Sequence, residues 1–335
     1  MTPPPLVRTL SAAVLAIALI GVSAASCQSS EASRSTKITL GFSAWPGWFP
    51  WQVAEEQDMF SRNGINVELR WFDNYTDSLN ALSAGSIDAN NQTLNDTLAS
   101  ISSGVSQTIV LINDNSTGND KIIAREGIDS VADLKGKKIA VEQGTVDHYL
   151  LLLALSQAGL TQQDIQLYPL STSAAALAFT SGQVDAVGAF APFTSVALGR
   201  AGSRAIATSA EFPGAIPDHL VVRPELIKEH PKMVQGLVNT WFDTINWIKR
   251  NPTEAAKIMA ERGGVSVAEY QNYDAGTTIF TRRQNLDAFT PGTTPAHLNY
   301  QAIQIADFIV ASGIAQRRPS LDGLFDQRFV AGVTS

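Results

Sequence analysis

Tryptophan is concentrated at one place in the chain. Three of the six tryptophans, Trp45, Trp48 and Trp51, follow one another at three-residue intervals. Trp45 precedes the helix that we expect after Pro46, so it is the first candidate for a flat wall against a ligand, and Trp48 is the second. Trp51 is expected in the core, because apolar residues at helical spacing bury one face of a helix. The alternative for all three rings is packing alone.

Acidic and polar side chains follow the expected strands. Open α/β sheets bind ligands beyond the carboxyl ends of their strands, so we read these loops as candidate ligand contacts. Besides the two tryptophans, the candidates are Asp73, Asn95, Asp96, Glu142, Thr145, Asp147, Phe190 and Asp218. Asp96 and Glu142 are the preferred carboxylates of the two halves of the site. Thr145 has an alternative role as a helix cap, and Phe190 as a core residue.

The sign of charge in these loops predicts the chemistry of the ligand. They carry carboxylates and no Lys or Arg, whereas an oxyanion is usually held by a guanidinium, an ammonium or free helix N-terminal amides. A cation gains about 0.5–2 kcal/mol over an aromatic face and ~4 kcal/mol at about 4 Å from a carboxylate near a protein surface. The loops therefore predict a small planar nitrogen-rich cation such as guanidinium. A pyrimidine stacked on Trp45 stays open, and the placement of Arg282 and Arg283 does not follow from the sequence.

Strand and helix patterns alternate along the folded part of the chain. Lys37 to Phe42 is a β-branched run typical of a buried strand, and similar βα steps repeat to about residue 190. This rhythm predicts an α/β fold with mostly parallel sheets and helices on both faces. Two similar sets of βα units predict two lobes, lobe 1 from residues 37–116 plus 217–335 and lobe 2 from residues 117–216. We expect two hinge crossings between them, near 113–120 and 212–218; the alternative is one continuous sheet.

The amino-terminal residues predict export. Arg8 precedes an apolar run from Leu10 to Val22, which is too short to span a bilayer and has the size of a signal-peptide core. The small residues before Cys27 resemble a bacterial lipobox. We therefore expect a signal peptide at 1–26, a lipidated Cys27, a polar tether at 27–36, and a protein anchored on the periplasmic or extracytoplasmic face of the cell membrane. The alternative is a plain secretory signal that is cleaved near Ala25.

Composition argues against several other classes of protein. The net charge of −7 disfavours nucleic acid, which needs a basic surface. The four histidines are scattered and do not form a metal-ligand pattern. We find no catalytic-triad or phosphate-loop motif, and we expect neither a metal nor another cofactor.

The order of three segments resembles one family of transport proteins. The segments GFSAWPGWFPWQVAEEQDMF, DLKGKKIAVEQGTVDHYLLLLAL and SGQVDAVGAFAPF resemble the nitrate/sulfonate/taurine group of ABC importer solute-binding proteins, which includes binders of thiamine pyrimidine precursors. The resemblance implies the type II periplasmic-binding-protein fold, hinge closure on a small solute, and partners in an ABC permease and ATPase. We expect a monomer.

The resemblance leaves the cargo open. The segment SAWPGWFPW is similar to a branch associated with guanidine and urea carboxylase, whereas the wider family implies nitrate, a sulfonate or taurine, or a thiamine pyrimidine precursor. Enzymes of this fold that make the thiamine pyrimidine use a cysteine-rich motif. Cys27 is the only cysteine, so we expect a binding protein and not an enzyme. A sensor that passes its signal to a receptor remains a further alternative.

Overall fold

The structure is a computed structural model that describes residues 37–333. The predicted signal peptide, the tether and Cys27 lie outside the described residues. No helix between residues 37 and 333 is long and apolar enough to cross a membrane.

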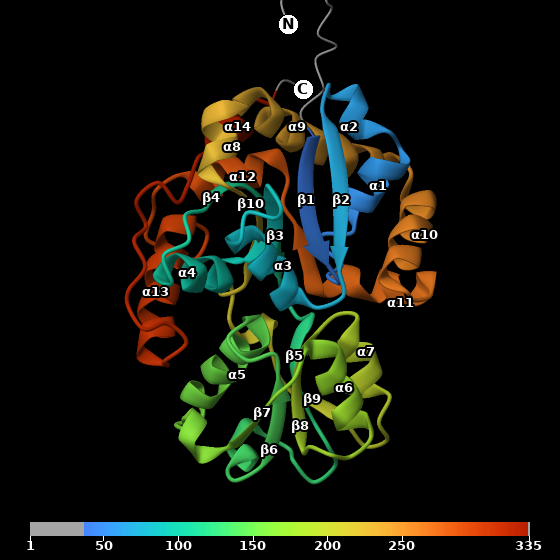
Figure 1. Ribbon diagram of the computed structural model, residues 1–335. Coiled ribbons are helices and arrows are strands. Elements are labelled where there is room, and N and C mark those ends of the chain that lie inside the picture. Colours follow the sequence, from blue (N-terminus) through green and yellow to red (C-terminus); the bar gives the residue numbers. More distant parts are fainter. Residues whose placement is uncertain (1–36, 334–335) are drawn as a thin grey trace, which may run out of the picture. The chain divides into compact units, whose positions relative to one another are not determined.

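The strands form two separate sheets (Figure 1). The first has six strands in the order β11-β4-β10-β3-β1-β2, and we call this sheet with its helices lobe 1. Its strands are β1 (Lys37–Ser43), β2 (Asn66–Phe72), β3 (Ala89–Thr93), β4 (Thr108–Ser116), β10 (Pro217–Val222) and β11 (Thr277–Ile279). The second has five strands in the order β7-β6-β8-β5-β9 and belongs to lobe 2. Its strands are β5 (Asp120–Ala124), β6 (Lys138–Val141), β7 (Gln166–Pro169), β8 (Ala186–Phe190) and β9 (Arg204–Thr208).

Helices pack on both sheets, and most of them lie in lobe 1. Those of lobe 2 are α5 (Val146–Gln157), α6 (Thr172–Thr180) and α7 (Phe193–Leu198). Those of lobe 1 are α1 (Pro50–Glu56), α2 (Met59–Arg62), α3 (Tyr75–Ser83), α4 (Leu94–Ser102), α8 (Pro224–Glu229), α9 (Pro231–Arg250), α10 (Pro252–Gly263), α11 (Val267–Tyr273), α12 (Arg282–Phe289), α13 (Leu298–Ala311) and α14 (Arg328–Ala331). The loops that lead from the strands into α1, α3 and α4 meet those of lobe 2 where the two sheets face each other (Figure 1).

The sheets are less parallel than the βα rhythm predicts. β1 pairs in parallel with β2 and β3, and β6 with β7 and β8. β10, however, runs antiparallel to β3 and β4, and β5 runs antiparallel to β8 and β9. β5 and β10 each begin directly after the chain has crossed from the other lobe. A strand that enters from the other lobe starts at the end of the sheet where its neighbours finish, so it pairs with them antiparallel.

Two crossings join the lobes. The first lies between β4 and β5, and the second between β9 and β10. They are bonded to each other, since the hydroxyl oxygens of Ser116 and Ser209 lie 2.7 Å apart and the Gly118 N–H donates to Ser209 Oγ over 2.7 Å. The lobe limits at residues 116/117 and 216/217 stay a prediction, although every strand lies on the expected side of them.

Close packing fixes the loop that carries the tryptophans. Trp51 is fully buried and donates from Nε1 to Asn91 Oδ1 over 2.9 Å, which confirms that it belongs to the core. A Cβ atom on Gly47 would overlap the carboxyl group of Asp114. A larger residue would force one of the two to shift, so the glycine lets the loop that carries Trp45 and Trp48 pack closely on β4.

Candidate functional site

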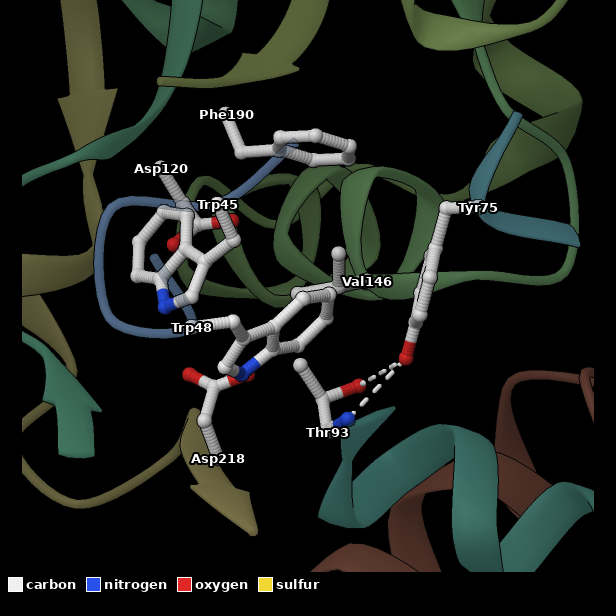
Figure 2. Close-up of a pocket in the computed structure, with 8 residues that line it drawn as sticks. All are labelled: Trp45, Trp48, Tyr75, Thr93, Asp120, Val146, Phe190 and Asp218. Carbon is white, nitrogen blue, oxygen red and sulfur yellow. Dashed lines mark hydrogen bonds between the residues drawn. The ribbon is translucent and has the colours of Figure 1, made fainter. Parts of the chain in front are cut away.

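A small cavity, with room for about one water molecule, lies where the two lobes meet. Its lining comes from both lobes and consists of Trp45, Trp48, Tyr75, Thr93, Asp120, Val146, Phe190 and Asp218 (Figure 2). Four of these eight residues, Tyr75, Thr93, Val146 and Phe190, end a strand or begin a helix, as the argument from open α/β sheets predicts.

Four aromatic rings enclose the cavity. Trp45 meets Phe190 edge to face, with ring centroids 6.4 Å apart, and Tyr75 meets Phe190 in the same way at 6.3 Å. Trp48 and Tyr75 are tilted at 5.5 Å. Because Phe190 ends β8 in lobe 2 and the other three rings belong to lobe 1, the aromatic enclosure is complete only when the lobes are together.

Carboxyl groups complete the lining. Asp218 lies on β10 directly opposite Asp114 on β4, and Asp120 begins β5 at the first crossing. Asp114 Oδ1 accepts a hydrogen bond of 2.9 Å from Trp45 Nε1. No N–H group and no hydroxyl group between residues 37 and 333 donates to Asp218, which is 1% exposed; its hydrogen-bond partner is the neighbouring acid Asp114. Figure 2 shows this carboxyl group directed toward the Trp48 ring, whose Nε1 has no partner in the described part of the chain.

Burial makes these acids weak. It raises the pKa of Asp114 to about 8, and the nearby Asp120 adds to the rise. It likewise raises the pKa of Asp120 to about 7. The pKa of Asp218 lies well above its usual range because the group is buried and faces Asp114 and Asp120. A buried carboxylate without a counter-charge is costly. A cation or a strong hydrogen-bond donor bound here would offset that cost.

No Lys or Arg among residues 37–333 lines this cavity. The neighbour of Asp120, Lys121, donates its ammonium group to the Gly118 carbonyl oxygen. Arg282 donates to the carbonyl oxygens of Val330 and Ala331, and Arg283 pairs with Asp287, all within lobe 1. These two arginines, whose position the sequence left open, therefore contact lobe 1 groups outside the cavity lining.

Glu142 and Asp73 lie at a second, adjoining cavity, which is too tightly closed to hold a water molecule. Glu142 Oε1 accepts from the Thr76 N–H over 2.9 Å, and Glu142 Oε2 accepts from the Thr172 N–H over 3.0 Å. Asp73 Oδ1 accepts from Trp71 Nε1 over 2.9 Å. The carboxylate of Glu142 is thus already bonded by protein groups from both lobes.

The remaining predicted residues lie behind the lining. Asp96 accepts hydrogen bonds from Thr93 Oγ1 and from the Asn95 amide, and burial raises the pKa of Asp96 to about 7. Thr145 precedes α5, and its hydroxyl donates to the Glu142 carbonyl oxygen over 2.8 Å. Asp147 Oδ2 lies 2.5 Å from Thr172 Oγ1. These four residues support the walls of the site, and only Asp96 and Thr145 reach an open groove beside it.

The structure brings together Trp45, Trp48, Phe190 and Asp218 from the predicted set, and it adds residues that the set omitted. The additional lining residues are Tyr75, Thr93, Asp120 and Val146, with Asp114 behind them. A signal was present for the acids, because Asp114 and Asp120 fall inside the crossing predicted at 113–120. Among residues 37–333 there is no group of three or more His, Cys, Asp or Glu side chains arranged to hold a metal ion.

Comparison with known proteins finds one family model and several relatives. A model of the NMT1-like family matches residues 31–263. A Brucella abortus protein, named provisionally as a binding protein, is 31% identical over 213 residues, which are 62% of this chain and 66% of that protein. The chain thus spans slightly less than two thirds of that relative. The taurine-binding periplasmic protein of Escherichia coli is 25% identical over 277 residues, 79% of this chain and 83% of that protein.

Solved structures share the fold. The alkanesulfonate-binding protein SsuA from Xanthomonas axonopodis pv. citri, bound to MOPS, superimposes with a TM-score of 0.74 at 21% identity, over 87% of this chain and 98% of that one. The desulfurization enzyme DSZB also matches, with a TM-score of 0.63 at 16% identity, over 88% of this chain and 97% of that one. At such identities the likeness concerns the fold alone, and it confirms the expected α/β type II periplasmic-binding-protein architecture.

Proposed function

Since the chain belongs to the NMT1-like family, in line with the nitrate/sulfonate/taurine resemblance of its sequence, we propose that it is the solute-binding component of an ABC importer. Its cargo is a small solute with a positively charged, nitrogen-rich group such as guanidinium. The cavity between the lobes captures it, and contacts made by both lobes favour the closed form by their differential energy.

One observation carries the choice of cargo. Among residues 37–333, Asp218 and Asp120 line an aromatic cavity without a basic side chain, and the hydrogen-bond partner of the Asp218 carboxyl group is another acid, Asp114. An unsatisfied buried polar group costs about 1–3 kcal/mol and a charged one more. A guanidinium supplies the missing donors and the missing charge at the same time.

Carboxylates contribute more to this selectivity than the rings do. A cation 4 Å from a carboxylate gains ~4 kcal/mol at an effective dielectric of about 20, whereas a desolvated cation–π contact gains about 2 kcal/mol. The four rings would accept many flat molecules. The acids discriminate against those that bring a negative charge.

An aliphatic sulfonate is the second candidate cargo, and the names of relatives favour it. Taurine-binding and alkanesulfonate-binding proteins share the fold of this chain. Taurine carries an ammonium group as well as a sulfonate, so the acids of the cavity suit one end of it. Nitrate and a thiamine pyrimidine precursor have no comparable support in this lining.

The partners and location follow from the proposed role. A solute-binding component works with a permease and an ATPase, and relatives are periplasmic by name. We propose that the chain acts as a monomer, tethered through a lipid on Cys27 to the outer face of the cytoplasmic membrane. It is proposed as a binding protein and not as an enzyme.

Calorimetric titration tests the cargo. Guanidinium chloride, methylguanidine and acetamidine are titrated in turn, followed by taurine, methanesulfonate and nitrate as sodium salts. We expect saturable binding of at least one cation and none of methanesulfonate or nitrate. Tight binding of methanesulfonate, with no response to any cation, would refute a cationic cargo and leave the transport role standing.

A further inference from the structure

Glu142 joins the two lobes through one carboxylate. Oε1 accepts from the N–H of Thr76, the second residue of α3 in lobe 1, and Oε2 accepts from the N–H of Thr172, the first residue of α6 in lobe 2. The hydroxyl groups of the same two threonines donate to the same two oxygens. Glu142 itself is 5% exposed and follows β6 directly.

The position between these two helices is one where negative charge is stabilised. The first amides of a helix have no partner inside it, and the helix dipole adds partial positive charge at this end. α3 and α6 bring two such ends to one point (Figure 1). Free oxyanions bind at helix N-termini for this reason, and here a side chain of the protein already does so.

The surroundings of Glu142 hold it in this position. The Thr172 hydroxyl lies 2.8 Å from Glu142 Oε2 and 2.5 Å from Asp147 Oδ2. It has one hydrogen, so it can donate to only one of them. Burial raises the pKa of Asp147 well above its usual range, and a protonated Asp147 donates to Thr172 Oγ1 and leaves the hydroxyl hydrogen for Glu142.

We propose that Glu142 determines specificity by exclusion: its carboxylate occupies the position between α3 and α6 that a sulfonate or other oxyanion would need. The inference deepens the proposed function and rests on it. The two helix ends line the cavity that adjoins the aromatic one, so a cargo that reaches both cavities meets a negative charge and no free amide. Positively charged or neutral cargo is not affected in this way.

The test is a gain of anion binding. Methanesulfonate and taurine are titrated into the wild-type protein and the Glu142→Ala variant. Removal of the carboxylate frees two pairs of donors, and we expect the affinity for methanesulfonate to rise at least tenfold in the variant. Loss of the bridge between the lobes affects closure on every cargo alike, so the ratio of the methanesulfonate affinity to the guanidinium affinity is the decisive readout.

Asp73→Ala is the matched control. Asp73 lines the same cavity as Glu142 and has the same charge, but its carboxylate accepts from Trp71 and not from a helix end. A gain of sulfonate binding in Asp73→Ala equal to that in Glu142→Ala would mean that overall charge decides, and would overturn the proposal. If Glu142→Ala does not fold, Glu142→Gln keeps the volume of the side chain and removes its charge.

Two outcomes separate this inference from the proposed cargo. Unchanged methanesulfonate affinity in folded Glu142 variants, together with guanidinium binding by the wild type, would overturn the exclusion and support the cationic cargo. Tight methanesulfonate binding by the wild type would overturn both.

Discussion

Asp218 lies directly opposite Asp114 in the register of β10 and β4. Both carboxyl groups are buried; Asp114 raises the pKa of Asp218, whereas a hydrogen bond from Asp218 lowers the pKa of Asp114. Two buried carboxyl groups in contact retain one shared proton more easily than they lose both protons. The empty cavity therefore retains protons near neutral pH, and a bound cation replaces them.

Cation binding should release protons. Since Asp114, Asp120 and Asp218 hold protons that a bound cation displaces, affinity for guanidinium should increase as the pH rises from 6.5 to 8.5. Titration in two buffers of different ionisation enthalpy measures the number of protons released. Uptake of protons, or an affinity that is independent of pH, would contradict the assignment of these acids.

The free energy of unfolding of the empty protein should fall over the same pH range. An unfolded Asp has a pKa near 3.9, whereas the pKa of Asp114 is about 8 and that of Asp120 about 7 in the folded chain. The folded state thus binds more protons, and its stability is lost as the pH rises through 7–8. Buried His219 has a lowered pKa and opposes this trend only below about pH 6.5.

Thermal unfolding at pH 6.5 and 8.5 measures this change. We expect a lower melting temperature at pH 8.5, and a smaller difference in Asp120→Asn. A melting temperature that rises with pH in the wild type would show that these carboxyl groups are ionised in the folded chain at neutral pH.

Asp218→Asn should weaken guanidinium binding at least tenfold. The change keeps the shape of the side chain and removes the charge, and a loss of about 1.4 kcal/mol corresponds to a factor of ten. Stability at pH 8.5 should not fall, because Asp114 no longer faces a second acid. Asp322→Asn, on an exposed residue near the carboxyl terminus, is the control and should bind as the wild type does.

Trp45→Phe should weaken guanidinium binding because it removes the hydrogen bond that positions Asp114, while an aromatic ring remains in the wall. Phenylalanine retains the aromatic wall but not the hydrogen bond of 2.9 Å to Asp114 Oδ1, and loss of a bond to a charged group costs about 1.5–3 kcal/mol. We expect reduced affinity and a shift of its pH dependence to higher pH, since Asp114 loses the donor that stabilises its charge. Trp247→Phe, on α9, is a control that should leave the guanidinium affinity and its pH dependence unchanged.

Cys27→Ala should release the protein from the membrane fraction. The prediction rests on the sequence around Cys27 alone. Labelling cells with radioactive palmitate should mark the wild type and not the variant. Label that persists in Cys27→Ala would exclude this cysteine as the lipid attachment site.

Local pattern predicted the elements better than the site. The run KITLGF is β1, and the buried Trp51 follows from helical spacing. Asp218 was predicted because it opens a strand at a crossing. Asp114 lies behind the cavity lining and belongs to the site through the register of β4 with β10 and its bond to Trp45; its place in the predicted crossing was the only sequence signal for it. Glu142 was recognised as a carboxylate at a strand end, but its bonds to Thr76 and Thr172 depend on how two distant helices meet.

The bond between Ser116 and Ser209 lies close to three of the acids of the site. Asp114, Asp120 and Asp218 flank the two crossings that these serines join. Points near an axis of rotation move least when two bodies turn about it. We therefore expect these three carboxyl groups to keep their spacing as the lobes move, so that the protons they hold are already in place when a cargo arrives.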